Sequence, residues 1–565
     1  MAANIQKGTK EAIAYRYGSP STASVSAQVP AATTTPFPAS STYGSAVTWQ
    51  VGGPYIADYG DYSSNQGQYA FVPDDAGKYV GIGTIEWLAQ RNNTFSYAPQ
   101  NSWTLPDPNV RMATVGTTEY YGAGVPAAMG RCYGTTCAQA VIAFGNGTLG
   151  VWGSNTTPTR ITAKLDAGKV PTAVTVTNGG EFALITVWDT TDPNTPKGQV
   201  AVVALAGSKY HMDWAADYPG LHNEGTYSFM KVLGYVDLPA DMTAPTDISA
   251  ATGVMYESYH RLYPPTGGGS CSSNFVTQNS MPLNVEANRQ TFMAGGCNYG
   301  SYAHGGVAVV TSKSEGKAAF INLKPLFDYY ESMYFTSASN FAQTSNLGQA
   351  ASQWPYPFSA VQSQMPTVIK TVDLGKRPTA VKVPLWTTQR ALIATEDGTL
   401  QFYGLANYLT NAAGATPADI ALKGSMAIGK NPTALAYSKH DPAGGDPTID
   451  SLIVVSRGES KIQWVNFSAD RNSGTIRRTL QDSRLKDPVW AEDNDSHGTD
   501  SYVLTVADYA GRQVANYRYG PVVFWSNPNG ACAPPSGCGM SGQFEFGGSY
   551  SVPGGVYQVT GANVP

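Results

Sequence analysis

A seven-residue phrase recurs along this chain and constrains its fold more than any other feature. It reads GKVPTAV from Gly168, GKRPTAV from Gly375 and GKNPTAL from Gly429, and a degenerate copy, KDPVWA, starts at Lys486. From proline to proline the intervals are 207, 54 and 56 residues. The first interval is close to four units of about 52 residues, and a fixed period of this size indicates a solenoid, a propeller or another repeat array.

The residues after each phrase also follow a shared pattern. An apolar, β-rich run comes next, then a polar turn, then a second alternating run; in the third copy these are residues 451–455, 457–459 and 462–465. Short alternating runs between turns, without a helical period, are typical of antiparallel strands. About four such strands per repeat make one propeller blade, which buries its faces only by stacking on its neighbours.

The order Pro-Thr-Ala-Val, strand, Asp-Gly-type turn, strand resembles the YVTN-type β-propeller repeats, with looser copies at residues 232–248 and 306–322. The resemblance covers about two-thirds of the chain and implies an all-β propeller. Dividing the roughly 400 residues between 120 and 520 by a period of about 53 predicts seven blades, with eight as the alternative. The resemblance says little about function, because the family includes surface-layer and adhesive proteins, lactone-cleaving enzymes and protein-binding scaffolds.

Composition divides the chain into a propeller, residues 58–520, and two extended arms, residues 1–57 and 521–565. The N-terminal arm is rich in Ser, Thr, Ala and Pro and has no charged residue from 17 to 57, and the C-terminal tail is rich in Gly. An uncharged insertion near 332–369 interrupts the repeat, and we expect its aromatic residues to contact other molecules: Tyr334, Phe335, Trp354, Tyr356 and Phe358. The arms are expected to add strands to a neighbouring copy, or alternatively to wrap their own propeller.

The low charge content favours contacts with other proteins over nucleic acid. Only 13% of the residues are charged, the net charge is −5, and no basic cluster occurs, so nucleic acid is not an expected partner. No apolar run approaches the roughly 18 residues of a membrane-spanning helix. The 34 tyrosines instead suit interfaces, because tyrosine combines a rigid contact area with a hydroxyl. We therefore predict a homo-oligomer or polymer.

The six cysteines fall into three sequence-near pairs, predicted to be the disulfides Cys132–Cys137, Cys271–Cys297 and Cys532–Cys538. Free buried thiols are the alternative. Disulfides indicate an oxidising compartment, so we expect an extracellular or cell-surface protein. The first residues do not form a secretory signal, which leaves a removed signal, another export route or a released particle as alternatives.

Motifs for catalysis are scarce, and one loop suggests a metal. The six histidines are interpreted as loop residues rather than a metal cluster: His211, His222, His260, His304, His440 and His497. Residues 492–500 contain D-x-D-x-x-G, and calcium prefers carboxylate oxygens on such a Gly-bent loop. Asp493, Asp495 and Asp500 are therefore candidate calcium ligands, with an acidic solvated turn as the alternative; no other cofactor is predicted.

These observations favour a non-enzymatic extracellular structural or interaction protein that self-assembles or adheres at a surface, as a surface layer, sheath, filament or adhesin component does. Two alternatives remain open. One is a lactonase-like or metal-dependent propeller enzyme, and the other is a monomeric binding propeller with its site at the mouth of the channel.

Overall fold

The computed structural model of the 565-residue chain describes residues 17–18, 20–22, 25, 29, 54–60, 71–73, 79–84, 90–91, 95–96, 126–131, 139–153, 162–207, 227–253, 262–265, 271, 281–384, 389–438, 451–496, 502–519, 545–551, 555–560 and 563–564. The predicted pairs Cys132–Cys137 and Cys532–Cys538, and Asp500, lie outside this part of the chain. No helix within the described residues is long and apolar enough to cross a membrane.

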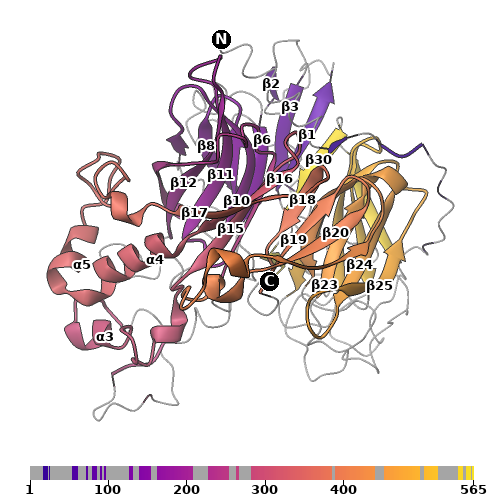
Figure 1. Ribbon diagram of the computed structural model, residues 1–565. Helices are drawn as coiled ribbons and strands as arrows, with labels where there is room; N and C mark the ends of the chain where they lie inside the picture. The colour runs from indigo at the N-terminus through magenta and orange to yellow at the C-terminus, as the bar shows by residue number, and fades with distance from the viewer. Residues whose placement is uncertain are drawn as a thin grey trace.

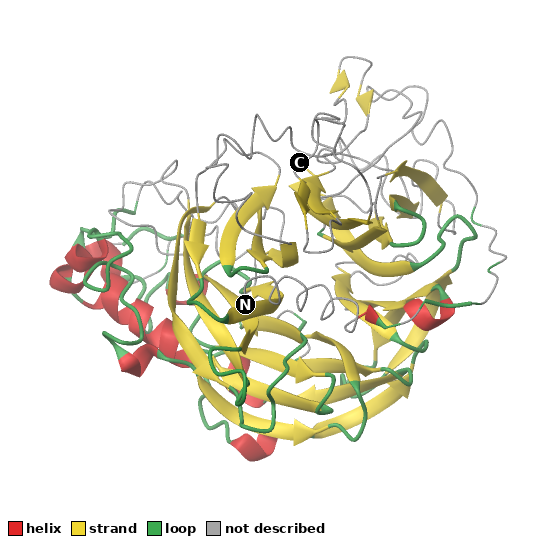
Figure 2. Ribbon diagram, turned by 90° about the horizontal axis from the view of Figure 1, so that it is seen from above, coloured by secondary structure: helices red, strands yellow, loops and turns green. Residues whose placement is uncertain are grey.

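The protein is an all-β propeller in which six blades are built from strands consecutive in sequence (Figure 1). Every neighbouring pair within these blades is antiparallel, and the strands are arranged around a common axis when seen from above (Figure 2). A short parallel strand, β31 (Asn563–Val564), extends the last blade. The strands of the six blades are β6 (Pro126–Arg131), β7 (Gln139–Phe144), β8 (Thr148–Gly153) and β9 (Thr162–Lys164); β10 (Lys169–Val176), β11 (Phe182–Asp189), β12 (Lys197–Gly207) and β13 (Tyr227–Asp237); β14 (Asp247–Thr252), β15 (Gly306–Ser312), β16 (Lys317–Asn322) and β17 (Thr367–Asp373); β18 (Pro378–Lys382), β19 (Arg390–Thr395), β20 (Thr399–Gly404) and β21 (Leu422–Ala427); β22 (Pro432–Ser438), β23 (Ser451–Ser456), β24 (Lys461–Phe467) and β25 (Gly474–Leu480); β26 (Pro488–Ser496), β27 (Tyr502–Asp508), β28 (Gln513–Tyr519) and β29 (Glu545–Ser551).

The repeated phrase lies at the start of the first strand of its blade. In each case the proline pairs with the second strand and a β-bulge follows at once, at Pro171, Pro378, Pro432 and Pro488. A first strand position or a bulge tolerates proline because the missing N–H breaks no ladder bond. A fifth copy at Pro126 has the same bulge, and it escaped detection in the sequence because Ala127 stands where the phrase has threonine.

In two copies of the phrase the threonine joins one blade to the next, whereas Thr379 Oγ1 donates to the Ala394 carbonyl of its own blade. Thr172 Oγ1 donates to the carbonyl of Pro245 at 2.8 Å, and Thr433 Oγ1 donates to the carbonyl of Val489 at 2.7 Å. Both hydroxyls are buried, so each bond satisfies polar groups that water cannot reach. These two threonines therefore link successive blades.

The prediction of seven or eight blades was wrong, because the chain forms six blades from consecutive strands. The interval of 207 residues between Pro171 and Pro378 holds two blade steps rather than four. Two insertions in one blade take up the difference, residues 253–305 between β14 and β15 and residues 323–366 between β16 and β17. Dividing a length by a period fails when insertions of this size lie inside a repeat.

The two ends of the chain meet in a further four-stranded sheet, with the strand order β2-β3-β1-β30. It consists of β2 (Phe71–Pro73), β3 (Tyr79–Thr84) and β1 (Pro54–Gly60) from the N-terminal region and β30 (Gly555–Val559) from the C-terminal region. Strand β30 contacts β26 of the last blade, and Tyr557 and Gln558 hydrogen-bond to β6 of the first blade. The remaining short hairpin pairs β4 (Gln90–Arg91) with β5 (Phe95–Ser96).

The prediction of two extended arms was therefore wrong in part. In the C-terminal tail, β29 pairs with β28 and β30 pairs with β1. Near the N-terminus, Tyr17 is 4% exposed and packs on the propeller of its own chain. The alternative, that the arms wrap their own propeller, describes these segments.

The two insertions pack together on one flank, where α3 (Glu286–Gln290), α4 (Lys324–Glu331) and α5 (Ala338–Thr344) lie (Figure 1). The rings of Phe292 and Phe335 stack with centroids 4.6 Å apart and join one insertion to the other. Tyr330 contacts Phe182 of the neighbouring blade at 4.9 Å. The flank is thus continuous with the core of the propeller.

Four of the five aromatic residues expected to contact other molecules are core residues of this flank. Tyr334, Phe335, Trp354 and Phe358 are at most 7% exposed. Phe358 covers Gly234, where a Cβ atom would lie only 2.7 Å from the ring. Tyr356 is partly exposed, so of the five residues it is the one placed to contact a second molecule.

The disulfide Cys271–Cys297 is confirmed, with a Cα–Cα distance of 5.3 Å across a sequence separation of 26 residues. It lies within the first insertion. The same insertion holds His304, which was interpreted as a solvated loop residue. The ring of this histidine instead stacks on that of Tyr299, with centroids 3.8 Å apart, and its Nδ1 lies 3.0 Å from Glu331 Oε2. Its contacts are therefore with neighbouring side chains of the protein.

Candidate functional site: the central channel

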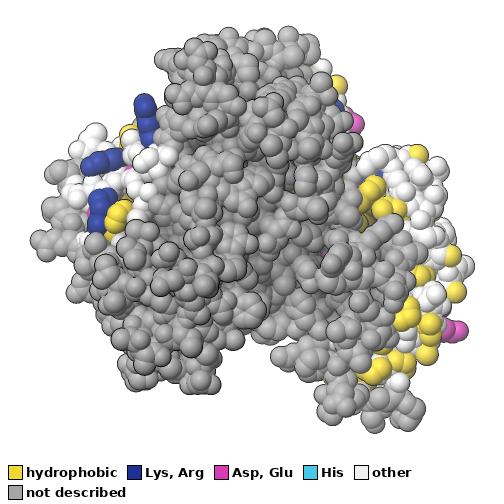
Figure 3. All heavy atoms as spheres, turned by 180° about the vertical axis from the view of Figure 1, so that it is seen from behind, with side chains coloured by type: hydrophobic (Ala, Val, Ile, Leu, Met, Phe, Trp, Pro, Cys, Tyr) yellow, Lys and Arg dark blue, Asp and Glu magenta, His cyan; other side chains and the backbone are white. Residues whose placement is uncertain are grey.

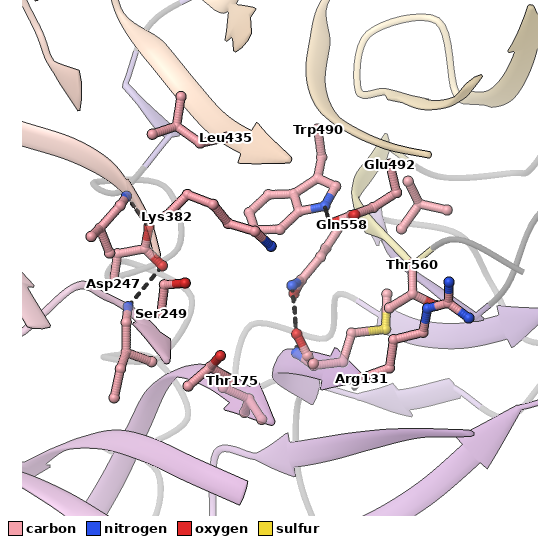
Figure 4. Close-up of a pocket in the computed structure, with 16 residues that line it drawn as sticks. Arg131, Thr175, Asp247, Ser249, Lys382, Leu435, Trp490, Glu492, Gln558 and Thr560 are labelled. Atoms are coloured by element: carbon pink, nitrogen blue, oxygen red, sulfur yellow. Dashed lines mark hydrogen bonds between the residues drawn. The ribbon is translucent and has the colours of Figure 1, made fainter. Parts of the chain in front are cut away.

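A cavity lies where the innermost strands converge on the propeller axis (Figure 4). Strands β6, β10, β14, β18, β22, β26 and β30 all contribute lining residues. The empty space between these residues is about 780 Å³, a figure that includes open solvent at the mouth. The polar side chains of this lining are Arg131, Thr175, Asp247, Ser249, Lys382, Trp490, Glu492, Gln558 and Thr560.

In Figure 4 the side chain of Lys382 points into this space, toward the indole of Trp490. It is the last residue of β18, four residues after the phrase proline Pro378. Within the described part of the chain its ammonium group has neither a hydrogen-bond acceptor nor an ion pair within 4 Å. A partly buried ammonium of this kind is suited to pairing with an anionic group.

Glu492 and Trp490 form the opposite wall and come from the same strand, β26. The indole Nε1 of Trp490 donates to Glu492 Oε1 at 3.0 Å. Burial raises the pKa of the Glu492 carboxyl, against the opposing attraction of Lys382 and Arg131 and the hydrogen bond from Trp490. The carboxyl is in contact with the cavity but surrounded by protein, so burial outweighs its cationic neighbours.

Asp247 and Ser249 act mainly as links between blades. Asp247 Oδ2 accepts a hydrogen bond from the Val381 N–H at 2.9 Å, and its Oδ1 accepts one from the Ile248 N–H. Ser249 Oγ accepts from the Val383 N–H at 2.9 Å. Since both side chains bind backbone of the next blade, they hold β18, and with it Lys382, at a fixed place in the cavity wall.

The other side of the cavity is held in a similar way. Gln558 accepts from the Met129 N–H at 3.1 Å and donates to the Met129 carbonyl at 2.7 Å, which joins β30 to β6. Thr175 Oγ1 accepts from the Ala250 N–H at 3.3 Å. The charged side chains therefore project from a ring of cross-linked strands, a rigid arrangement that lowers the entropic cost of binding a ligand.

The predicted calcium residues are not part of this cavity lining. Asp493 and Asp495 belong to β26, where the backbone of Asp493 pairs with Leu504 and that of Asp495 with Asn563, so this part of the segment is a strand rather than a loop. In the described part of the chain no three His, Cys, Asp or Glu side chains lie close enough to hold a metal ion. Because the side chains of the three aspartates are outside the described part, calcium binding there stays a prediction.

Sequence reasoning missed the cavity residues, although a signal for them exists. Lys382, Glu492 and Thr175 each stand four residues after a phrase proline. Once the phrase is placed at the start of the innermost strand, this position is expected near the axis. The missing step was to compare the residues at one repeat position rather than to search for motifs contiguous in sequence.

The fold defines the chain as a β-propeller. No protein-family model matches it, and no curated protein matches it in sequence. Membership of the YVTN-type repeat family therefore stays a prediction.

Solved structures match at low similarity. They include the periplasmic gluconolactonase PpgL of Pseudomonas aeruginosa, with a TM-score of 0.41, 10% identity and coverage of 91% of this chain and 100% of that chain. The β-propeller domain of Myceliophthora thermophila Cps50 (Swd1) has a TM-score of 0.34, 10% identity and coverage of 69% and 82%. The WD40 domain of Toxoplasma gondii coronin has a TM-score of 0.33, 10% identity and coverage of 75% and 70%. Similarity this low gives no information about activity, and the propeller fold follows from the strand pairing of the chain itself.

Proposed function

We propose that this protein is a non-enzymatic binding β-propeller whose site is the central channel and whose ligand is a small anion with a flat apolar face. The observation that supports this most is Lys382, whose ammonium projects into the cavity beside the indole of Trp490 without a protein acceptor in the described part of the chain. An anionic group would pair with the ammonium, and the flat face would pack on the indole.

The electrostatics of the cavity favour this ligand class. Arg131 adds a second positive charge, and the carboxylate of Asp247 already accepts two backbone N–H bonds. Burial disfavours the ionised form of the Glu492 carboxyl, while Lys382, Arg131 and the hydrogen bond from Trp490 favour it. A low-dielectric channel strengthens the attraction of the remaining positive charge for an anion.

Calorimetric titration with acetate and benzoate tests the proposal. We expect benzoate to bind more tightly than acetate, because only benzoate offers a flat apolar face, and binding should quench tryptophan fluorescence. Lys382→Met should weaken benzoate binding about tenfold or more, as expected for a charge-assisted contact. Lys423→Met removes the same charge from exposed β21 and is the matched control. Equal binding by the two variants would refute the role of Lys382.

The enzymatic alternative is separated by a second measurement. A lactonase-like or metal-dependent propeller would turn over a lactone probe and contain stoichiometric metal in the native preparation. We expect neither, and turnover that is lost in Lys382→Met or Glu492→Gln would replace the binding proposal with a catalytic one.

We also propose that the protein works outside the cytosol as a structural or interaction component that self-associates. Support comes from the disulfide Cys271–Cys297, which is typical of oxidising compartments, and from the low charge content. The described side chains visible from behind are mostly apolar or neutral, with Lys and Arg gathered at one edge (Figure 3). Analytical ultracentrifugation of native material tests this function, and a strictly monomeric protein at high concentration would contradict it.

A further inference from the structure

Arginines of the last two blades contact the main chain of the N-terminal anchor segment, residues 17–29, at its described residues Tyr17, Gly18 and Val29. Arg457 Nη1 donates to the carbonyls of Tyr17, at 3.1 Å, and Gly18, at 2.6 Å. The same guanidinium is fixed by Asp487, through Nε–Oδ1 at 2.8 Å and Nη2–Oδ2 at 2.7 Å. Arg457 and Asp487 are both buried, so the pair is a preformed holder for two peptide carbonyls.

A second arginine repeats this arrangement further along the segment. Arg484 donates to the carbonyl of Val29 and pairs with Asp482, whose side chain is 1% exposed. Tyr517 also donates to Asp482, at 2.9 Å, which fixes the carboxylate. Two arginines held by buried aspartates therefore bind main-chain carbonyls about a dozen residues apart in the sequence.

Side-chain contacts make the site selective for an aromatic residue followed by glycine. The ring of Tyr17 packs against Trp490 at 6.4 Å and Tyr557 at 6.0 Å between centroids. Gly18 has a φ of +64°, and a Cβ atom there would lie 2.8 Å from the amide nitrogen of Asn431. A bulkier residue at this position would be strained in its backbone and would collide with Asn431.

We propose that this docking site, formed by Asn431, Arg457, Asp487, Trp490, Tyr557 and Arg484, also takes the anchor segment of a second copy of this chain. Residues 30–53, 24 in all, connect Val29 to β1 and can span up to about 80 Å when extended. The contacts of Tyr17 and Gly18 are the same whether the segment comes from the same chain or from a neighbour. Such an exchange of identical elements is a low-cost route to an assembly.

This inference rests on the proposed self-association and names its contact. The chain's own segment competes at a high effective concentration, so exchange is expected when copies are crowded, as at a surface. A linear array can result, because each copy carries one anchor segment and one docking site.

A complementation experiment with full-length variants tests the exchange. Tyr17→Ala disables the anchor segment, and the double variant Arg457→Met, Asp487→Leu disables the docking site without leaving a lone buried charge. Neither variant alone can form the contact, whereas a mixture offers one intact segment and one intact, vacated site. Native mass spectrometry should show a heterodimer at least tenfold more abundant than the dimer of either variant alone.

A second measurement avoids relying on the double variant. A labelled peptide of residues 15–30 should bind Tyr17→Ala, and the same peptide with Gly18→Val should bind at least tenfold more weakly. Thr22→Ala, an exposed change within the segment, is the matched control and should behave as wild type. A folded mixture without heterodimer, or a peptide that does not bind Tyr17→Ala, overturns the exchange. Wild-type self-association that persists in Tyr17→Ala would leave the proposed function standing and refute only this contact.

Discussion

Lys231 is expected to hold the second insertion against the propeller, and replacing it should release that insertion locally. Its ammonium donates to three main-chain carbonyls, those of Gly348, Ala350 and Gln353, at 2.9, 2.8 and 2.9 Å. Burial lowers the pKa of Lys231 to about 8, so at pH 7 the group is still protonated and all three N–H bonds are available. We expect Lys231→Met to keep the packing of the side chain and remove these bonds.

The size of the effect follows from the surroundings of the three carbonyls. A hydrogen bond to a charged group contributes about 1.5–3 kcal/mol, so three in a dry site would exceed about 5 kcal/mol. Here Lys231 is 3% exposed, but Ala350 is exposed on the other side of the loop, so water can replace part of the loss. We therefore expect a local destabilisation of about 2–4 kcal/mol.

Hydrogen exchange measured by mass spectrometry is the suitable assay, because the change should be confined to one segment. A loss of about 2–4 kcal/mol corresponds to roughly 30- to 1000-fold faster exchange in peptides covering residues 346–354, while the blades keep their protection. Lys317→Met is the control, since its pair with Asp241 is screened by solvent and should contribute little to stability.

Two outcomes would refute this reasoning. Exchange in residues 346–354 within about threefold of wild type would show that the three bonds add nothing beyond what water supplies. Faster exchange spread evenly over all blades would show that Lys231 stabilises the whole fold rather than the insertion.

Three further predictions concern the channel, the disulfide and the contact between blades. The raised pKa of Glu492 means that the folded protein binds this proton more tightly than the unfolded chain, so the stabilisation is complete below about pH 4.5 and is lost as the pH rises through the folded pKa. Glu492→Gln should therefore raise the melting temperature at pH 7 but not at pH 3.5 in calorimetry, and a lower value at pH 7 would show that its cationic neighbours dominate. Replacing Cys271 and Cys297 by serine should destabilise the first insertion by about 2–4 kcal/mol. Hydrogen exchange during a denaturant titration measures this, and unchanged protection of the amides in the insertion would contradict it. Gly130→Ala should cost about 1–3 kcal/mol in chemical denaturation, because its Cβ would lie 2.6 Å from a carbonyl oxygen of the next blade, whereas Gly300→Ala, which meets nothing within 4 Å, should be neutral.

The sequence predicted the blade-forming strands well because their determinants are local. Pro378, Pro432 and Pro488 begin first strands, Pro171 is the third residue of one, and the alternating runs after them are the second and third strands. Blade number and the fate of the chain ends depend on non-local pairing. Nothing in residues 54–60 or 555–559 indicates that they pair with each other across almost the whole chain.

Composition alone also could not predict that the aromatic insertion is buried. An uncharged, aromatic segment suits an interface and a core equally well, since both remove apolar surface from water. What decided the outcome is a partner within the chain, the first insertion, which supplies Phe292 against Phe335. A long, apolar insertion beside a second insertion in the same blade is better interpreted as a shared core.

The repeat explains why the candidate site lies in the channel and why no contiguous motif indicated it. Three residues after each phrase proline the six blades carry an apolar residue that is at most 9% exposed: Met129, Val174, Ile248, Val381, Leu435 and Ala491. One position later the residues differ in size and charge, namely Gly130, Thr175, Ser249, Lys382, Ala436 and Glu492, and all but Ala436 line the cavity. Both positions line the cavity in most blades, but the first is always a buried apolar residue, whereas the next one varies in size and charge. Because each of four blades supplies one such residue, a binding site with a lysine, a glutamate and two hydroxyls is assembled from four separate repeats. Exchanging residues at this position should change the ligand preference without unfolding the propeller. Ser249→Lys tests this, because it adds a second ammonium opposite Glu492 and removes the hydrogen bond to the Val383 N–H. Ligand affinity and melting temperature, measured on the same variant, report the two effects separately.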